Sequence, residues 1–370
     1  MRRWQKKQRH KREMLRQQKY GMYLAQKEQE IQYILNSQIQ VLNENNISLP
    51  EVAAIIKNKS RTIWSRETKE NDFLRVRLGL GDCPADLTIS APEKHFSLDE
   101  DDLINKVIDV PGKYSTLKNI PITFSLIENN ISSFIFDCDF KDTYIDGLLL
   151  QLFAFHSPLD LKIVLFTDSE NEERWHYLKK LPHFWSADHS IRFFATDSEE
   201  TKTVLAFLDK EFTRREENNK GDTEEKIQEN RNEKRDAPYT KYNEYYLIIT
   251  DDYNNIKNYT FLSKFLKENV NLGFSLVFFG DDIKNLPQEC NTFVQIYEKE
   301  SGIFNKELNT DTLVKFKADY DPTINMEELA STISNIPVKS KDLASSLPTS
   351  VSFLEMYKIG KIEQFNVLNR

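Results

Sequence analysis

The ten residues Asn243–Asp252, NEYYLIITDD, point most directly to a fold class for this chain of 370 residues. From Tyr245 onward, aromatic and β-branched side chains follow one another until the two carboxylates of Asp251 and Asp252. A nearly continuous apolar run is typical of a strand buried on both faces, as in a parallel sheet between helices. We therefore expect further apolar strands and intervening helices elsewhere in the chain.

Apolar runs of the same kind recur from about Ile120 onward. The other predicted strands are Ser132–Phe140, Leu161–Asp168, Ile191–Asp197, Phe274–Asp282 and Thr292–Glu298. A buried helix is predicted over Tyr144–Ser157, and this alternation indicates an α/β fold with a mostly parallel sheet and helices on both faces. Four of the strands end in aspartate, so the carboxyl edge of the sheet, where open α/β sheets bind ligands, is expected to be acidic.

A long helical segment is predicted before the sheet. Residues 2–42 contain no proline and only one glycine, and from Leu24 the apolar residues recur at helical spacing in a narrow stripe. A second, short helix is expected around Pro50–Asn58, with Ser48 near its N-cap.

Two other segments depart from these patterns. Residues Phe73–Leu78 alternate with period two and predict a strand, after which Gly79 and Gly81 are predicted to form a turn. The stretch Arg214–Lys241 contains a single aliphatic residue, Ile227, and is too polar to bury itself. It is therefore predicted to be a disordered surface insertion.

Composition limits the classes of protein. Charged residues make up 29% and aromatic residues 12%, as in a globular chain. No apolar run approaches the roughly 20 residues that a membrane-spanning helix needs. The three cysteines are far apart in sequence, which excludes a disulfide framework or a Cys-x-x-Cys metal pair and fits a reducing compartment.

The first 20 residues form a basic arm. They carry a net charge of +8, which leaves −16 for the remainder of a chain whose total is −8. Three interpretations stay open: a solvated helix end, a juxtamembrane segment beneath anionic headgroups, or a nucleic-acid arm. A tryptophan among the basic residues favours a membrane interface. The residues expected to contact the membrane surface are Arg2, Arg3, Trp4, Lys6, Lys7, Arg9, Lys11 and Arg12.

The link between the strand at Ser132 and the following helix is where a P-loop would lie. Its sequence, DCDFKDTYIDG, places Lys141 and Thr143 plausibly, but no glycine precedes them to let backbone N–H groups approach phosphate. The aspartates at positions 137, 139 and 142 would repel a triphosphate at the start of the helix. The sequence therefore predicts a degenerate nucleotide site.

The acidic end of NEYYLIITDD has two interpretations. Asp251 could hold Mg²⁺, as the equivalent residue does in working ATPases, or it could cap the following loop. Asp252 stands where a hydrolytic base often lies. We expect no catalytic residue, cofactor or metal in this chain; residual nucleotide binding would involve Lys141, Thr143, Asp251 and Asp252, and a residual metal would involve Asp251.

Five segments occur in an order that resembles one family. They are FLRVRLGLGDCPADLTI (Phe73–Ile89), HSPLDLKIVLFTD (His156–Asp168), RWHYLKKLPHFWS (Arg174–Ser186), LPQEC (Leu286–Cys290) and LPTSVSFLEMYKIGKIEQFNVLNR (Leu347–Arg370). Together they resemble the cytoplasmic region of EssC/EccC, the membrane-anchored FtsK/SpoIIIE-family ATPases of type VII (ESX) secretion systems. The resemblance spans about Asn71 to Arg370.

The resemblance implies a P-loop-NTPase-like (RecA/FtsK-like) fold that kept its sheet and lost its phosphate loop. It implies a basic juxtamembrane helical stalk (1–70), a small β-containing connector (71–119), a degenerate ATPase-like α/β domain (120–335, with the insertion at 214–241) and a connector towards the next ATPase domain (336–370).

It also implies a non-catalytic module that couples a membrane channel to ATP-driven protein export on the cytoplasmic side of the cell membrane. Its partners would be membrane components of the secretion system, an anionic lipid surface, downstream ATPase domains that bind ATP and Mg²⁺, and other copies in a hexameric parent. A nucleotide-binding ATPase domain and an FtsK-type DNA translocase fragment are the alternatives. The acidic body disfavours nucleic acid.

Overall fold

The computed structural model describes residues 2–92, 102–226, 242–268, 270–282, 286–306 and 314–338. Within them, ten strands form one sheet in the order β2-β1-β10-β9-β8-β3-β7-β6-β4-β5. Asn335–Arg370 are a separate unit. The predicted connector at 336–370 lies outside the described residues from position 339 onward and stays a prediction.

One part of the sheet is parallel throughout. Its strands are β3 (Ile131–Asp137), β4 (Leu161–Phe166), β5 (Phe194–Ala195), β6 (Tyr245–Thr250), β7 (Phe274–Gly280) and β8 (Thr292–Tyr297). Every pairing among these six strands is parallel. All six residues of β4 and all six of β6 are buried, as expected for strands covered on both faces.

Helices lie on both faces of this part. On one face, α5 (Ser198–Lys226) and α7 (Thr260–Phe265) pack against Val164, Ile248 and Leu276. On the other face lies α4 (Lys141–Phe155), whose Tyr144 meets Phe136 of β3 edge to face. The predicted α/β class, with a mostly parallel sheet and helices on both faces, is confirmed.

The other part of the sheet is antiparallel and was only partly predicted. It consists of β1 (Arg75–Pro84), β2 (Thr116–Ser125), β9 (Ser301–Asn305) and β10 (Val314–Ala318). These strands continue the parallel part, because β9 pairs with β8 and β1 pairs with β10. The predicted boundary at 119/120 falls inside β2, so residues 71–119 contribute strands to the same sheet instead of forming a connector beside it.

Gly79 and Gly81 do not form the predicted turn. They lie inside β1, which pairs with β10 on one side and with β2 on the other. A Cβ atom on Gly79 would stand 2.0 Å from the carbonyl oxygen of Lys317, and one on Gly81 would stand 2.4 Å from that of Lys315. Glycine is needed here because another backbone comes too close for a side chain.

The insertion predicted at 214–241 lies only partly within the described residues. Helix α5 extends to Lys226, so Arg214–Lys226 is helical and the prediction of disorder is wrong for that stretch. The physical reason is Arg215, which is buried at the amino edge of the sheet instead of lying in solvent. Residues 227–241 lie outside the described residues.

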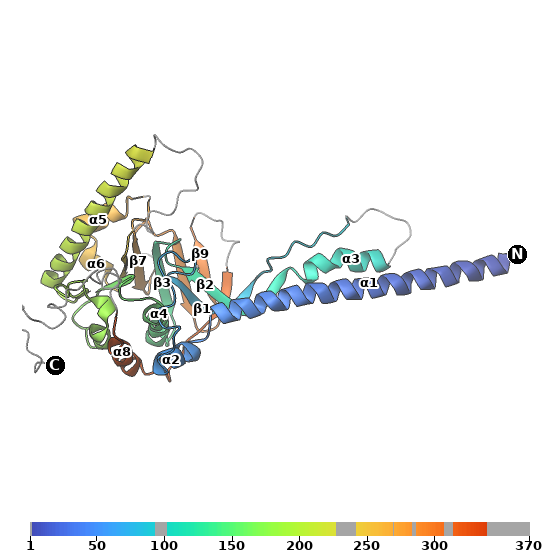
Figure 1. Cartoon of the computed structure of the whole chain (residues 1–370), viewed down its shortest axis with the longest axis horizontal. Coiled ribbons are helices and arrows are strands. Elements are labelled where there is room, and N and C mark those ends of the chain that lie inside the picture. Colours follow the sequence, from blue (N-terminus) through green and yellow to red (C-terminus); the bar gives the residue numbers. More distant parts are fainter. Residues whose placement is uncertain are drawn as a thin grey trace, which may run out of the picture. The chain divides into compact units, whose positions relative to one another are not determined.

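The long N-terminal helix is confirmed as α1 (Arg2–Asn45). It is followed by α2 (Leu49–Lys57), where Ser48 and Glu51 form a capping box. Lys113 of α3 (Asp102–Lys113) lies 3.3 Å from Glu28 of α1, so α3 lies along α1 (Figure 1).

The remaining helices are short: η1 (His176–Lys180), η2 (Pro182–Phe184), α6 (Tyr253–Ile256) and α8 (Met326–Ser334). In the part of the chain that the structure describes, none of the helices combines the length and the apolar character required to span a bilayer.

Candidate functional site

The carboxyl ends of the parallel strands meet at one edge of the sheet. Phe166 pairs with Thr250, Thr250 with Phe278, and Asp137 with Tyr297. The aspartates that follow these strands therefore share this edge, as the sequence predicted. This is the edge at which an α/β sheet of this class binds ligands.

The connection between β3 and α4 is short. β3 ends at Asp137 and α4 begins at Lys141, so only three residues join them. A P-loop motif of the form G-x-x-x-x-G-K-S/T is longer and wraps its N–H groups around phosphate. Here the N–H of Asp139 donates to Oε1 of Glu298, at 2.9 Å. A carboxylate of the chain itself occupies a donor that an anion would use.

Lys141 and Thr143 are not brought together on one site. Nζ of Lys141 lies 2.7 Å from Oδ1 of Asp281, after β7, and over the ring of Phe136. Thr143 lines a cavity of about 100 Å³ between α4, α2 and the segment before α8. The two side chains therefore contact different parts of the chain.

Asp251 is half-buried and holds two hydrogen bonds. Its Oδ2 accepts from Thr167 Oγ1 at 2.9 Å and from Trp175 Nε1 at 3.3 Å. Its Oδ1 is buried and has no hydrogen-bond partner among the residues that the structure describes. Burial raises the pKa of Asp251 above its ordinary value, and the hydrogen bonds from Thr167 and Trp175 oppose this shift.

Asp252 has a different role. It is the N-cap of α6, where its side chain accepts from the N–H of Asn254 at 3.1 Å. Loop capping, which the sequence suggested for Asp251, is therefore performed by Asp252. The partners of Asp251 were not predicted, although Thr167 directly follows a recognisable apolar strand.

An ion-pair network at the first turns of α4 was also missed. Arg174 lies 2.7 Å from Oδ1 of Asp146 and donates to the carbonyl of Asp142 at 2.8 Å. The hydroxyl of Tyr177 donates to the same Asp146 oxygen at 2.6 Å. Burial raises the pKa of Asp146, against the effect of Arg174. This network attaches the segment around η1 to α4, and its only sequence signal is the quoted stretch RWHYLKK.

No group of three His, Cys, Asp or Glu side chains within the described ranges is arranged to hold a metal ion. What the edge offers is a set of carboxylates, most of them bound to donors of the chain itself.

No family model matches the chain. The ESX secretion system protein EccC of Geobacillus thermodenitrificans (strain NG80-2) is 24% identical over 365 residues, which is 98% of this chain. The type VII secretion system protein EssC of Staphylococcus aureus (strain NCTC 8325 / PS 47) is 24% identical over 356 residues, or 96% of the chain. The chain is similar to EccC and EssC over nearly its whole length.

The chain spans 24% of the length of that EccC and 23% of that EssC. Among solved structures, the cytoplasmic domain of the Thermomonospora curvata type VII secretion ATPase EccC is similar to this chain, with a TM-score of 0.46 and 15% sequence identity. The match covers 78% of this chain and 34% of the EccC chain. The resemblance to EccC and EssC, predicted from about Asn71 onward, extends over nearly the whole sequence.

Proposed function

We propose that this chain is a non-catalytic coupling module of a type VII secretion motor. In this proposal it lies between the membrane and ATP-driven domains of a longer EccC/EssC-type protein. ATP and Mg²⁺ would bind in those downstream domains. The homologues, which are named as type VII and ESX secretion proteins, support the role in secretion.

The observation that carries the non-catalytic role is the β3–α4 connection. The Asp139 amide is bound by Glu298, and the Lys141 ammonium is bound by Asp281. A triphosphate would have to displace both carboxylates and then remain beside them. Two like unit charges 4 Å apart repel by about 4 kcal/mol at an effective dielectric constant of 20. The groups that a phosphate would need are thus engaged by carboxylates that would repel it.

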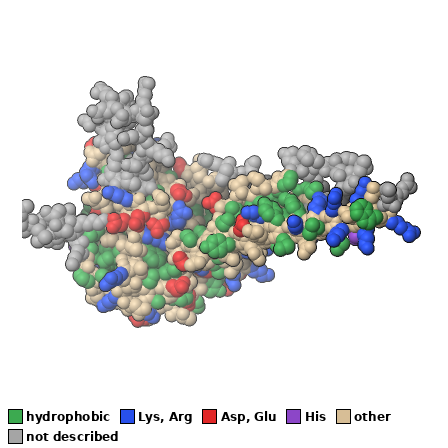
Figure 2. Space-filling view, turned by 45° about the vertical axis from the view of Figure 1, so that its right-hand side comes forward, with side chains coloured by type: hydrophobic (Ala, Val, Ile, Leu, Met, Phe, Trp, Pro, Cys, Tyr) green, Lys and Arg blue, Asp and Glu red, His purple; other side chains and the backbone are tan. Residues whose placement is uncertain are grey.

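The basic arm supports a position at the membrane. Lys and Arg side chains gather towards the N-terminal end of α1 (Figure 2). Trp4 among them is 68% exposed. We propose anionic lipid headgroups, membrane components of the secretion system and downstream ATPase domains as partners, with further copies in a hexameric parent. The side of the membrane would be cytoplasmic.

A second candidate function is residual binding of Mg²⁺ and nucleotide at Asp251. It is favoured by the buried Oδ1 atom that has no hydrogen-bond partner within the described ranges. A DNA-translocase fragment is disfavoured by the net charge of −16 outside the arm, since this charge would repel phosphate.

Calorimetric titration of the 370-residue chain with Mg·ATP, and with Mg²⁺ alone, separates these candidates. We expect no binding heat at millimolar nucleotide. Micromolar affinity that Asp251→Ala abolishes would overturn the proposal in favour of a nucleotide site. Asp197→Ala is the matched control, because it removes a carboxylate that follows β5 at the same edge and that accepts from the backbone N–H groups of Glu199 and Glu200.

A further inference from the structure

Two buried arginines contact the C-terminal end of α1: Arg66, which precedes β1, and Arg77, which lies in β1. Arg66 donates from Nη2 to the carbonyl of Asn45 at 3.0 Å, and Arg77 donates from Nη1 to that of Asn46 at 2.8 Å. The two arginines are 7% and 9% exposed. A helix leaves its last carbonyls unsatisfied and carries partial negative charge there, so two cations are favourable partners.

Arg77 also binds elements on its other side. Its Nε donates to Oδ2 of Asp319 at 2.6 Å, just after β10. Its backbone N–H donates to Oε1 of Gln151 at 2.8 Å, and its carbonyl accepts from Nε2 of Gln151 at 3.0 Å. Gln151 is a buried residue of α4. One residue of β1 therefore contacts the end of α1, the end of β10 and the middle of α4.

Asp319 leads directly to the carboxyl edge. The next residue, Tyr320, stacks its ring on Phe140, with centroids 4.0 Å apart and planes inclined by 6°. Phe140 is the residue immediately before α4, in the three-residue connection at the degenerate nucleotide site. Tyr320 is 43% exposed, so part of this side chain remains in contact with solvent.

We propose that Arg77 couples the C-terminal end of α1 to the Phe140–Tyr320 pair, so that a displacement of either one loosens the other. Movement of the stalk helix would then reach the edge of the sheet where working ATPases hold nucleotide. Two groups share one guanidinium: the carbonyl of Asn46 and the carboxylate of Asp319. If one of these acceptors moves, the guanidinium of Arg77 moves with it, and the hydrogen bond to the other acceptor changes its geometry. The inference rests on the proposed function only in taking α1 as the membrane-side element.

Hydrogen exchange of the nucleotide-free chain tests the coupling, whether or not the chain binds Mg·ATP. Tyr320→Ala removes the stacked ring from the surface and should leave the core folded. If the ends are coupled, the amide of Asn46, which donates to the Leu42 carbonyl at 3.1 Å, should exchange faster. The amide of Tyr144, at the start of α4, should also exchange faster. The matched control is Tyr320→Phe, which keeps the ring and should change neither amide.

The reciprocal variant is Arg77→Met, with Arg75→Met as its control on the same strand. Coupling must be mutual if it exists. Arg77→Met should raise exchange at both Asn46 and Tyr144 by about tenfold to a hundredfold, the range given by losing a hydrogen bond to a charged group. Amides of β6 and β7 should be unaffected. Arg75 contacts Glu128 at 3.4 Å, and its replacement should affect neither end.

An Asn46 amide that exchanges at the wild-type rate in Tyr320→Ala would overturn the proposal. So would an Arg77→Met chain in which only the Asn46 side responds. Should Arg77→Met fail to fold, the Tyr320→Ala result decides alone.

Discussion

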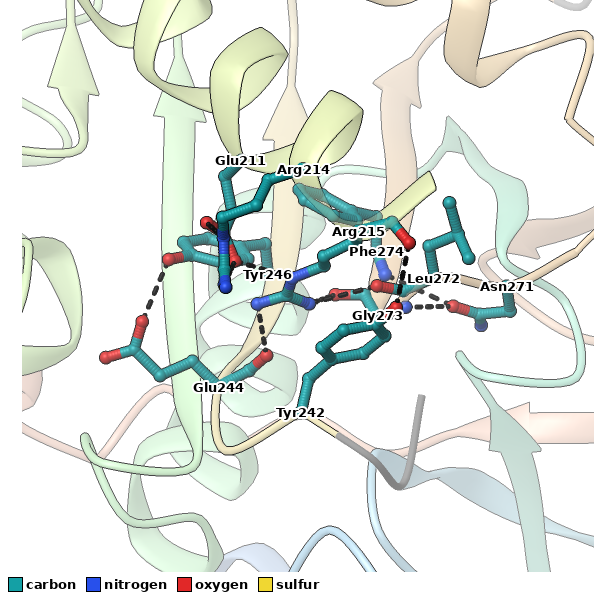
Figure 3. A network of polar contacts seen from close by, with 10 residues as sticks. All are labelled: Glu211, Arg214, Arg215, Tyr242, Glu244, Tyr246, Asn271, Leu272, Gly273 and Phe274. Carbon is teal, nitrogen blue, oxygen red and sulfur yellow. Dashed lines mark hydrogen bonds and ion pairs between the residues drawn. The ribbon is translucent and has the colours of Figure 1, made fainter. Parts of the chain in front are cut away.

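The two edges of the parallel sheet differ in how deeply their charged side chains are buried and in how completely these side chains are paired. At the amino edge, where β6 and β7 begin, Arg215 is 2% exposed and nearly every donor that it offers has a partner (Figure 3). At the carboxyl edge, Lys141 pairs with an Asp281 side chain that is 72% exposed, and Asp251 keeps an unpaired oxygen among the described residues. The amino edge encloses a cation, whereas the polar groups of the carboxyl edge are partly exposed or incompletely paired.

The amino-edge cluster is held together from three elements. Arg215 donates from Nη1 to the carbonyl of Leu272 at 3.0 Å and from Nη2 to that of Glu244 at 2.9 Å, and its Nε pairs with Glu211 at 2.7 Å. The rings of Tyr242, Tyr246 and Phe274 lie 4.4–5.1 Å from its guanidinium carbon.

A glycine makes room for this guanidinium. Gly273 has a φ of +86°, and a Cβ there would stand 2.4 Å from Nη1 of Arg215. The amino edge is therefore closed around one buried cation, whereas the ion pair of Lys141 and Asp281 at the carboxyl edge is partly exposed.

The largest expected effect is that of Arg215→Met. The substitution leaves the carbonyls of Leu272 and Glu244 without their donor and Glu211 without a buried partner. Removing one member of a buried pair costs about 3–5 kcal/mol of unfolding free energy. Urea unfolding should show this loss as a lower midpoint with an unchanged slope.

Arg214→Met is the control for that experiment. Arg214 binds the same Glu211 at 2.6 Å, but its side chain is 59% exposed. Its replacement should change the unfolding free energy by less than about 1 kcal/mol, as for exposed pairs. Equal losses in the two variants would contradict the assignment of Arg215 as the residue that stabilises the amino edge.

The next effect is a loss of stability in mild acid, caused by two buried histidines. His156 accepts from the N–H of Leu74 at 3.0 Å, and the carbonyl of His156 contacts His183 Nε2 at 2.8 Å. Burial lowers the pKa of His156 to about 3 and that of His183 to about 4. Because both pKa values are depressed in the folded state, their contribution is present above the unfolded value of 6.5 and is lost as pH falls below it.

Between pH 6.5 and pH 5 the unfolding free energy should fall by about 3 kcal/mol, since only the unfolded chain takes up the two protons. Urea midpoints measured across this range check the slope. In His183→Gln the slope should be roughly halved; a profile as steep as that of the wild-type chain would assign the acid sensitivity to other groups.

A smaller effect is expected at the carboxyl edge. Lys141→Met removes an exposed ion pair with Asp281, and such pairs contribute about 0–1 kcal/mol. Urea unfolding of this variant should therefore nearly overlay the wild-type curve. A loss as large as that expected for Arg215→Met would show that both edges stabilise the fold equally, and would remove the distinction between them.

The parallel strands could be predicted because their apolar runs are continuous, as in Tyr245–Thr250. The antiparallel strands were harder. β10 reads VKFKA and is half exposed, and β2 contains Pro121, so neither gives a continuous run. Helix α3 was missed since Pro111 lies inside it. Arg215 was hidden in a charged run, although it follows Leu208 and Phe212 at helical spacing, which is a signal that could have revealed it.

The candidate site divides in the same way. Its location and its missing glycines follow from the local sequence DCDFKDTYIDG. The groups that occupy it, Glu298, Asp281 and Tyr320, lie 140 or more residues further along the chain. Pairings over such separations depend on the strand order, which no local pattern encodes.

The smallest expected effect on stability is that of removing the basic arm, for which we expect no change. Side chains from Arg3 to Lys19 are exposed, whereas partial burial in α1 begins at Gly21. Deleting Met1–Lys19 should therefore leave the melting temperature of the chain unchanged. It should abolish binding to vesicles that contain anionic lipid, because each Lys or Arg near such a surface contributes about 1 kcal/mol.

Vesicle flotation with the full chain measures this binding. Salt at about 0.5 M should release the chain, since it shortens the screening length well below that at physiological ionic strength. Basic residues surround the helix on all sides in Arg2–Lys19, so the arm has no apolar face with which to insert, and neutral vesicles should bind weakly. Equal binding to neutral and anionic vesicles would contradict the electrostatic account. A lower melting temperature after the deletion would show instead that the arm packs on the folded body.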